Sequence, residues 1–214
     1  MKMVVKLLIS ALVISSTGSL WAASITNDSG LAAPVSTVTF DEIVFSQGTE
    51  ITDQYVSYGI TFESLVYYDS QGNASFPGVE THYVGNNSTP LINPFSISFT
   101  STQTAAAFGI ATNPATTTFT AKLNGVVVES YQSSTDFDDP SISFQGFEGI
   151  SFDEIEISVG GDGQALIDNI QMGVAAPPPL GDVEPVPSNA AWAMGALILL
   201  LVSFGFIAIN RRFT

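Results

Sequence analysis

Alternation between polar and apolar residues dominates the middle of this 214-residue chain. Alternation with period two, rich in Thr, Ile, Val and Phe, is typical of strands that bury one face. No long helical period interrupts it between residues 36 and 173. We therefore predict an all-β domain over 36–173. The alternating segments are 36–40, 59–62, 95–99, 141–144, 150–159 and 165–172.

A hairpin is predicted over residues 116–131, because Asn124-Gly125 stands between two apolar runs. Eight to ten short strands joined by Gly, Asn, Pro and Ser turns indicate a β-sandwich. Spacing between the strands is uneven, with long loops at 69–80 and 132–140. This unevenness favours a jelly-roll-like sandwich over an immunoglobulin-like one. Residues 24–35 are expected to form an N-terminal extension.

The C-terminal segment 189–214 contains 20 uncharged residues, from Ala190 to Ile209. Twenty helical residues cover roughly 30 Å, the thickness of the hydrocarbon layer, so we predict one transmembrane helix. A buried core helix is the alternative. Arg211 and Arg212 follow the span, and the positive-inside rule then places the C-terminus in the cytoplasm. Residues 174–188, with five prolines, are expected to form a stiff linker.

The N-terminal 23 residues have the features of a signal peptide. Lys2 and Lys6 form the basic region, residues 7–14 the apolar region, and Ala22-Ala23-Ser24 the small residues near a cleavage site. The expected product is an exported body attached to the inner membrane by a single C-terminal span. Processing would instead release it to the cell surface or the medium.

Acidic residues crowd the predicted body. All 20 Asp and Glu lie between the two terminal signals, and Lys122 is the one basic residue there, so this part carries −19. Such a charge repels nucleic acids and anionic lipids, so we expect no nucleic-acid partner. It could collect divalent cations. Adaptation to a salty medium, where charges are screened within about 10 Å, explains it equally well.

Few catalytic chemistries remain open to this body. The chain has no cysteine, which excludes thiolate nucleophiles and cysteine metal sites, and His82 is its one histidine, with no nucleophile elbow. Zinc sites usually need several His or Cys ligands. We therefore expect a non-enzyme. The alternative is a secreted polysaccharide hydrolase using paired carboxylates from two acidic clusters, Asp136, Asp138 and Asp139 or Asp153, Glu154 and Glu156.

Aromatic side chains that could stack on a sugar are all Phe or Tyr in the body, since both tryptophans lie in the terminal signals. Tyr68 and Tyr83 flank the predicted 69–80 loop. We predict these two as ligand-binding residues, with a place in the core or its rim as the alternative.

The tail resembles the C-terminal sorting signals of exosortase substrates, the PEP-CTERM and IPTL-CTERM class of exported bacterial proteins. A short proline motif, an apolar span and a basic end follow one another in the order of that class, although Val186 stands where the PEP motif has Glu. The resemblance implies that an exosortase-type membrane protease cuts near Pro187. A plain tail anchor is the alternative. The residues that carry the resemblance are Glu184, Pro185, Val186, Pro187, Ser188, Trp192-Ala193-Met194, the apolar span, Arg211 and Arg212.

The body is similar to exported galactose-binding-like jelly rolls, which include carbohydrate-binding modules. The similarity lies in a Phe-Asp pair at 40–41, Gly-Ile-Thr-Phe at 59–62 and Ala-Leu-Ile-Asp-Asn-Ile at 165–170. It implies an extracellular polysaccharide as partner. It also implies a structural calcium held by Asp41 or Glu42 together with Asp168, supplemented by further oxygen ligands. In the alternative, Asp168 only caps the end of a strand.

Overall fold

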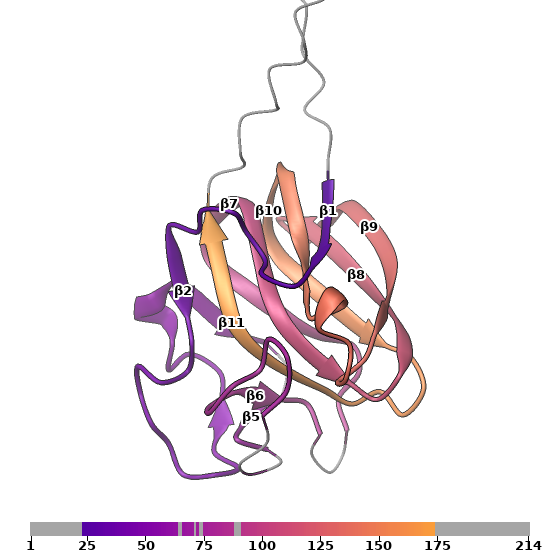
Figure 1. Cartoon of the computed structure of the whole chain (residues 1–214). Helices are drawn as coiled ribbons and strands as arrows, with labels where there is room; N and C mark the ends of the chain where they lie inside the picture. Colours follow the sequence, from indigo (N-terminus) through magenta and orange to yellow (C-terminus); the bar gives the residue numbers. More distant parts are fainter. Residues whose placement is uncertain (1–22, 64–65, 71, 73–74, 88–90, 174–214) are drawn as a thin grey trace, which may run out of the picture. The chain divides into compact units, whose positions relative to one another are not determined.

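Antiparallel strands form almost all the regular structure of the part that we describe (Figure 1). The computed structural model describes residues 23–63, 66–70, 72, 75–87 and 91–173. Two 3₁₀ helices, η1 (Val56–Tyr58) and η2 (Pro140–Ile142), lie between strands. The strands are β1 (Ala23–Asn27), β2 (Ser36–Val38), β3 (Glu50–Ile51), β4 (Ile60–Phe62), β5 (Val66–Tyr68), β6 (Val84–Gly85), β7 (Phe95–Thr112), β8 (Ala115–Leu123), β9 (Val126–Thr135), β10 (Phe144–Val159) and β11 (Ala165–Gly173).

Two long strands, β7 and β10, run through the whole sheet and pair with each other in two separate stretches. Between these stretches the register shifts near Glu148 and Phe152, and Gly149 has a φ of 79°. Irregularities of this kind bend a strand. The bend divides the sheet into two portions, one with β1, β11, β2, β6, β5 and β3, the other with β4, β8 and β9.

The two portions pack face to face, which makes the fold β-sandwich-like. Phe108 lies on the part of β7 that pairs with β11, in the first portion, and Phe119 lies on β8, in the second. Their ring centroids are 5.9 Å apart. Phe147 and Phe152, on either side of the bend in β10, are 6.0 Å apart. One cluster of buried side chains fills the space between the portions. This core needs no disulfide, in agreement with the size of the domain.

Both ends of the described body lie at the same end of the sheet (Figure 1). Ala23 pairs with Glu148, Glu148 with Ala105, and Ala105 with Gly173, so these residues form one row across four strands. The start of β11 at Ala165 lies at the opposite end, about 26 Å from Gly173 at 3.3 Å per residue. Loops at this opposite end are therefore the farthest from the two points where the chain continues.

The sequence predicted the β11 segment and the β8–β9 hairpin correctly. Asn124 and Gly125 have φ values of 51° and 76°, as a type I′ turn requires. Three expectations need correction. Residues 24–27 are not an extension, because they belong to β1, and residues 141–143 contribute to η2 and its C-cap rather than to a strand. Residues 132–135 end β9 instead of opening a loop.

Several predicted features lie outside the described residues. They are the signal peptide up to residue 22, the 174–188 linker, the sorting motif and the C-terminal apolar segment. Within the described ranges, no helix has the length and hydropathy that a membrane crossing demands.

Candidate functional site

A cavity of about 250 Å³ opens at the end of the sheet opposite to Ala23 and Gly173. Its floor is formed by the end of β7 and the start of β11, which pair with each other at Thr112 and Ala165. Two loops complete the walls, one between β5 and β6 and one between β9 and β10. The lining residues are Phe76, Ala111, Thr112, Asn113, Phe137, Gln164, Ala165 and Leu166.

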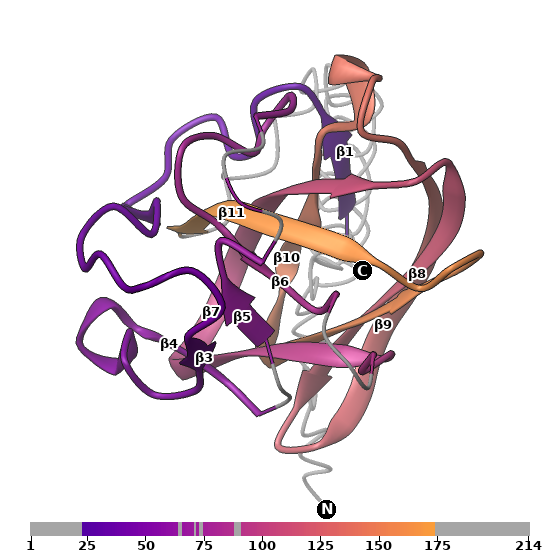
Figure 2. The ribbon, with the colours of Figure 1, turned by 90° about the horizontal axis from the view of Figure 1, so that it is seen from below.

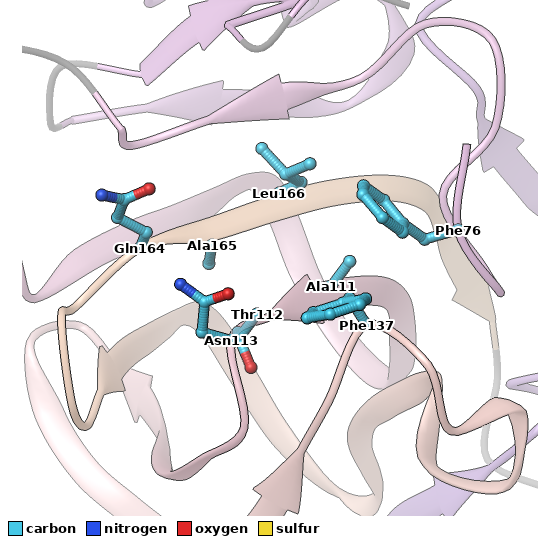
Figure 3. Close-up of a pocket in the computed structure, with 8 residues that line it drawn as sticks. All are labelled: Phe76, Ala111, Thr112, Asn113, Phe137, Gln164, Ala165 and Leu166. Carbon is cyan, nitrogen blue, oxygen red and sulfur yellow. The ribbon is translucent and has the colours of Figure 1, made fainter. Parts of the chain in front are cut away.

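Two phenylalanines form one side of this cavity (Figure 3). Phe76 and Phe137 come from the two different loops, and their ring centroids lie 5.6 Å apart at an interplanar angle of 61°. They pack against a small apolar cluster that includes Leu166 and Ala111. This cluster is separate from the main core. The cavity therefore has an apolar wall of its own.

Carboxamide groups lie at the other side, where Figure 3 shows Asn113 and Gln164. The Asn113 Nδ2 donates a hydrogen bond to the Asp162 carboxylate, which ties the β7–β8 turn to the β10–β11 loop. Thr112 donates to the Thr135 hydroxyl at 2.7 Å. None of the eight described lining residues carries a charge. The cavity thus combines aromatic faces with neutral donors and acceptors.

The loop that carries Phe76 is held close to the sheet. Phe76 and Val79 form a two-residue bridge, with N–H···O distances of 2.8 and 2.9 Å. The Asn169 Nδ2 donates to the Gly78 carbonyl at 3.2 Å. This approach requires a glycine at position 109, because a Cβ there would overlap the Gly78 carbonyl oxygen. Phe76 is therefore placed by backbone contacts rather than by its own ring alone.

Asp168 on β11 also holds the loop that carries Phe76. Its side chain is buried, and its carboxylate accepts hydrogen bonds from the Glu80 N–H at 2.8 Å and the Asn169 N–H at 2.6 Å. Burial raises the pKa of Asp168 to about 7, and the negative charges of Asp41 and Glu80 add to this rise. These two hydrogen bonds lower the pKa, but burial outweighs them.

Two of the three residues predicted to hold calcium have other contacts in this structure. Glu42 accepts two hydrogen bonds from Thr39 through Oε1, and its Oε2 is buried without a hydrogen-bond partner among the described residues. Asp41 is exposed and lies 3.8 Å from His82 Nε2. Within the described ranges, no three His, Asp or Glu side chains are grouped so that they could hold a metal ion. The calcium site stays a prediction.

Tyr68 and Tyr83 are both completely buried, so neither ring presents a face on which a ligand could stack. The Tyr68 hydroxyl donates to the Phe40 carbonyl at 3.1 Å, and its ring stacks on His82. Burial raises the pKa of Tyr68 to about 12. The Tyr83 hydroxyl donates to the Gly72 carbonyl at 2.6 Å. In this structure both tyrosines stabilise the β5–β6 loop from inside.

Four of the six acids considered for a hydrolase have structural contacts. Glu154 and Glu156 both pair with Lys122, at 3.0 and 2.7 Å. Asp153 accepts the Asn124 N–H of the hairpin turn. Asp139 caps η2 by accepting the Ser141 N–H at 2.9 Å, and hydrogen bonds from Ser141 lower its pKa. These acids stabilise turns and one ion-pair cluster.

Comparison of the chain with protein-family models and with curated proteins gives no match. Sequence reasoning located the two loops but missed Phe76 and Phe137, because an isolated Phe in a loop has no periodic pattern. One signal was available: each is a large apolar residue surrounded by polar or small ones, in Ala74-Ser75-Phe76 and Asp136-Phe137-Asp138.

Proposed function

We propose that this protein is an exported, non-catalytic component of the cell envelope or extracellular matrix, and that its body binds polysaccharide. The observation that carries the binding part is the uncharged cavity with two Phe rings, at the end of the body farthest from Ala23 and Gly173. A ligand there would bind at the end of the body opposite to Ala23 and Gly173, where the chain continues. Concave sites with an apolar wall and a few converging polar groups are the usual form of small-ligand sites.

The export part of the proposal rests on the terminal sequences. An N-terminal signal peptide and a C-terminal apolar segment ending in Arg211-Arg212 support a body outside the inner membrane. The proline motif at 185–188 supports processing by an exosortase-type enzyme. The mass of the mature protein, isolated from the native cell, tests this directly. A chain ending near Pro187 agrees with processing, whereas a chain ending at Thr214 leaves a plain membrane anchor.

A jelly-roll arrangement is the finer form of the fold that we propose for the sandwich-like body. The two long strands that take part in both portions of the sheet support it. The absence of catalysis is supported by the roles of four of the acids weighed for glycoside cleavage: Asp139 and Asp153 make contacts that stabilise turns, and Glu154 and Glu156 pair with Lys122.

Polysaccharide binding is tested by retention of the full-length protein, purified in detergent, on insoluble or immobilised polysaccharides. Retention that persists in high salt is expected, because the cavity is uncharged and its contacts are not screened. A variant with Phe137→Ala should be retained less, and Gln132→Ala, on the exposed face of β9, should behave like the unchanged protein. Failure of every polymer to retain the protein would remove the binding part of the proposal.

We further propose a structural calcium near Asp41, Glu42 and Asp168. The buried and unpartnered Glu42 Oε2 supports it, because a buried carboxylate oxygen without a donor is a ready ligand for a cation. The melting temperature should then rise in millimolar calcium, and Asp168→Ala should abolish the rise. An unchanged melting curve of the parent protein would contradict the calcium site.

A further inference from the structure

We infer that the cavity between the Phe76 and Phe137 loops takes one uncharged pyranose unit, at the end of a glycan chain. This inference rests on the proposed polysaccharide binding and assigns the site, its size and its charge preference. Four observations carry it: the volume, the contacts that join the walls of the cavity, the lining chemistry and the charges of neighbouring residues.

The volume limits the occupant. The cavity measures about 250 Å³. Pockets for drug-sized ligands occupy about 300–1,000 Å³, so this cavity has room for a single six-membered sugar ring rather than for several consecutive units. A site for a stretch of chain would need a longer groove.

The walls indicate the end of a chain rather than its middle. The floor is continuous β-structure, because Thr112 and Ala165 pair there as neighbouring strands. On the aromatic side, the contact between Phe76 and Phe137 joins the two loops, and Asn113 ties the turn on the other side to Asp162. A sugar can enter from the open side, whereas a polymer lying across the cavity would have to pass over the Phe76–Phe137 contact or the Asn113–Asp162 hydrogen bond.

The lining fits the two kinds of surface that a pyranose presents. Its C–H face is apolar and matches the Phe rings, and its hydroxyls donate and accept hydrogen bonds. Carboxamides such as those of Asn113 and Gln164 both donate and accept, so they match vicinal hydroxyls without a charged group. A Phe ring also offers no hydroxyl of its own, which makes that side selective for an apolar face.

Charges around the rim exclude acidic sugars. Asp136 and Asp138 flank Phe137 in the sequence, and Asp162 bonds to Asn113. Lys122, the one Lys or Arg of the described ranges, is engaged by Glu154 and Glu156 on another part of the sheet. A uronic acid in the cavity would face like charges without a compensating cation, and repulsion of this kind is an effective source of specificity.

The test uses the full-length protein in detergent with methyl-labelled alanine and leucine, so that the Ala111 and Leu166 methyl signals report on the cavity. The probes are the methyl glycosides of glucose, galactose and mannose, and methyl glucuronide. At least one neutral glycoside should shift both methyl signals, with a Kd on the order of 1 mM for so small a ligand. Methyl glucuronide should leave them unchanged, and a tetrasaccharide ending in the bound sugar should bind within about twofold of the monosaccharide, because a single unit makes all the contacts.

Variants separate the site from the rest of the surface. Asn113→Ala changes an exposed residue and should leave the fold intact. It therefore still tests the site if Phe137→Ala is unstable. Both should weaken binding by about tenfold or more. Tyr58→Ala, which removes an aromatic ring that is 38 % exposed outside the cavity, and Gln132→Ala should have no effect.

The inference is overturned if no neutral glycoside shifts the two methyl signals, if the glucuronide binds equally well, if affinity rises steadily with chain length, or if Asn113→Ala and Phe137→Ala bind normally. Retention on polysaccharide together with any of these results would leave the proposed function standing and remove only this site. Loss of polysaccharide retention as well would remove both.

Discussion

Phe76 and Phe137 are 61 positions apart in the chain, yet their rings pack edge to face at a centroid distance of 5.6 Å. This contact joins the β5–β6 loop to the β9–β10 loop and forms the apolar side of the cavity (Figure 3). Figure 2 shows the body from below, with β5, β6 and β11 labelled, and residues of both loops line the cavity together with Ala165 and Leu166 at the start of β11. A single aromatic pair therefore determines both the packing of this end and the chemistry of the candidate site.

The coupling between these two rings should be measurable. We expect Phe76→Ala and Phe137→Ala to show an interaction energy of about 0.5–1.5 kcal/mol in a double-mutant cycle, as edge-to-face pairs do. The free energy of unfolding from urea denaturation provides the measurement. Additive single effects would show that the two loops are stabilised independently.

Asp168 should make stability depend on pH. Its pKa in the folded protein is about 7, above the ordinary value of 3.8 that applies when the chain is unfolded. Its contribution is therefore fully present below pH 3.8 and is lost as pH rises to about 7, by roughly 4 kcal/mol at 1.36 kcal/mol per unit. Urea denaturation at several pH values, with a chelator present, compares the parent with Asp168→Asn.

The difference between these two proteins isolates the carboxyl group, because all other acids are common to both. The parent should lose stability relative to Asp168→Asn between pH 4 and 7. A constant difference across this range would show that the folded protein does not shift the pKa of Asp168. Calcium, if it binds there, should reduce the difference by favouring the ionised form.

Tyr131 connects three strands and should be sensitive to loss of its hydroxyl. The hydroxyl accepts the Gly146 N–H at 3.0 Å and lies within 3.2 Å of both the Ile25 carbonyl and the Gln145 Oε1, one of which takes its proton. Burial raises its pKa. Tyr131→Phe leaves a buried N–H and an oxygen without their partner, so we expect a loss of about 1–3 kcal/mol.

Thermal and urea denaturation test this, with Tyr58→Phe as the matched control. Tyr58 is 38 % exposed, and removal of its hydroxyl should change the free energy of unfolding by less than about 0.5 kcal/mol. Equal effects of the two variants would contradict the structural role of Tyr131.

Lys122 on β8 forms ion pairs with two carboxylates of β10, Glu154 and Glu156, on the outer face of the sheet. Its ammonium lies 3.0 Å from Glu154 and 2.7 Å from Glu156, and these carboxylates raise its pKa. Lys122→Met leaves the two carboxylates facing each other, so stability should fall by about 1–2 kcal/mol, between the values for exposed and buried pairs. Denaturation in 50 mM and 1 M salt should show a smaller loss at high salt, and a loss unaffected by salt would indicate that packing of the Lys122 stem is responsible.

The all-β character and the β8–β9 hairpin could be predicted from the sequence, because period-two alternation and the Asn124-Gly125 turn are local signals. The C-terminal half of β7 could not. Residues 105–112 are buried on both faces and consist mainly of Ala and Gly, so they show no alternation. β1 was missed for a related reason, since a strand beside the predicted cleavage site has only its pairing with β10 to identify it.

The sequence by itself determined the class of fold, the acidic charge of the body and the shortage of catalytic side chains, since composition and periodicity depend only on the order of residues. Only the tertiary structure decided which aromatic residues line a cavity. Tyr68 lies in β5 and Tyr83 directly before β6, and both are completely buried. Phe76 and Phe137 meet because two loops 61 positions apart converge on the same end of the sheet. Contacts over such distances follow from strand order and register, and no local pattern records them.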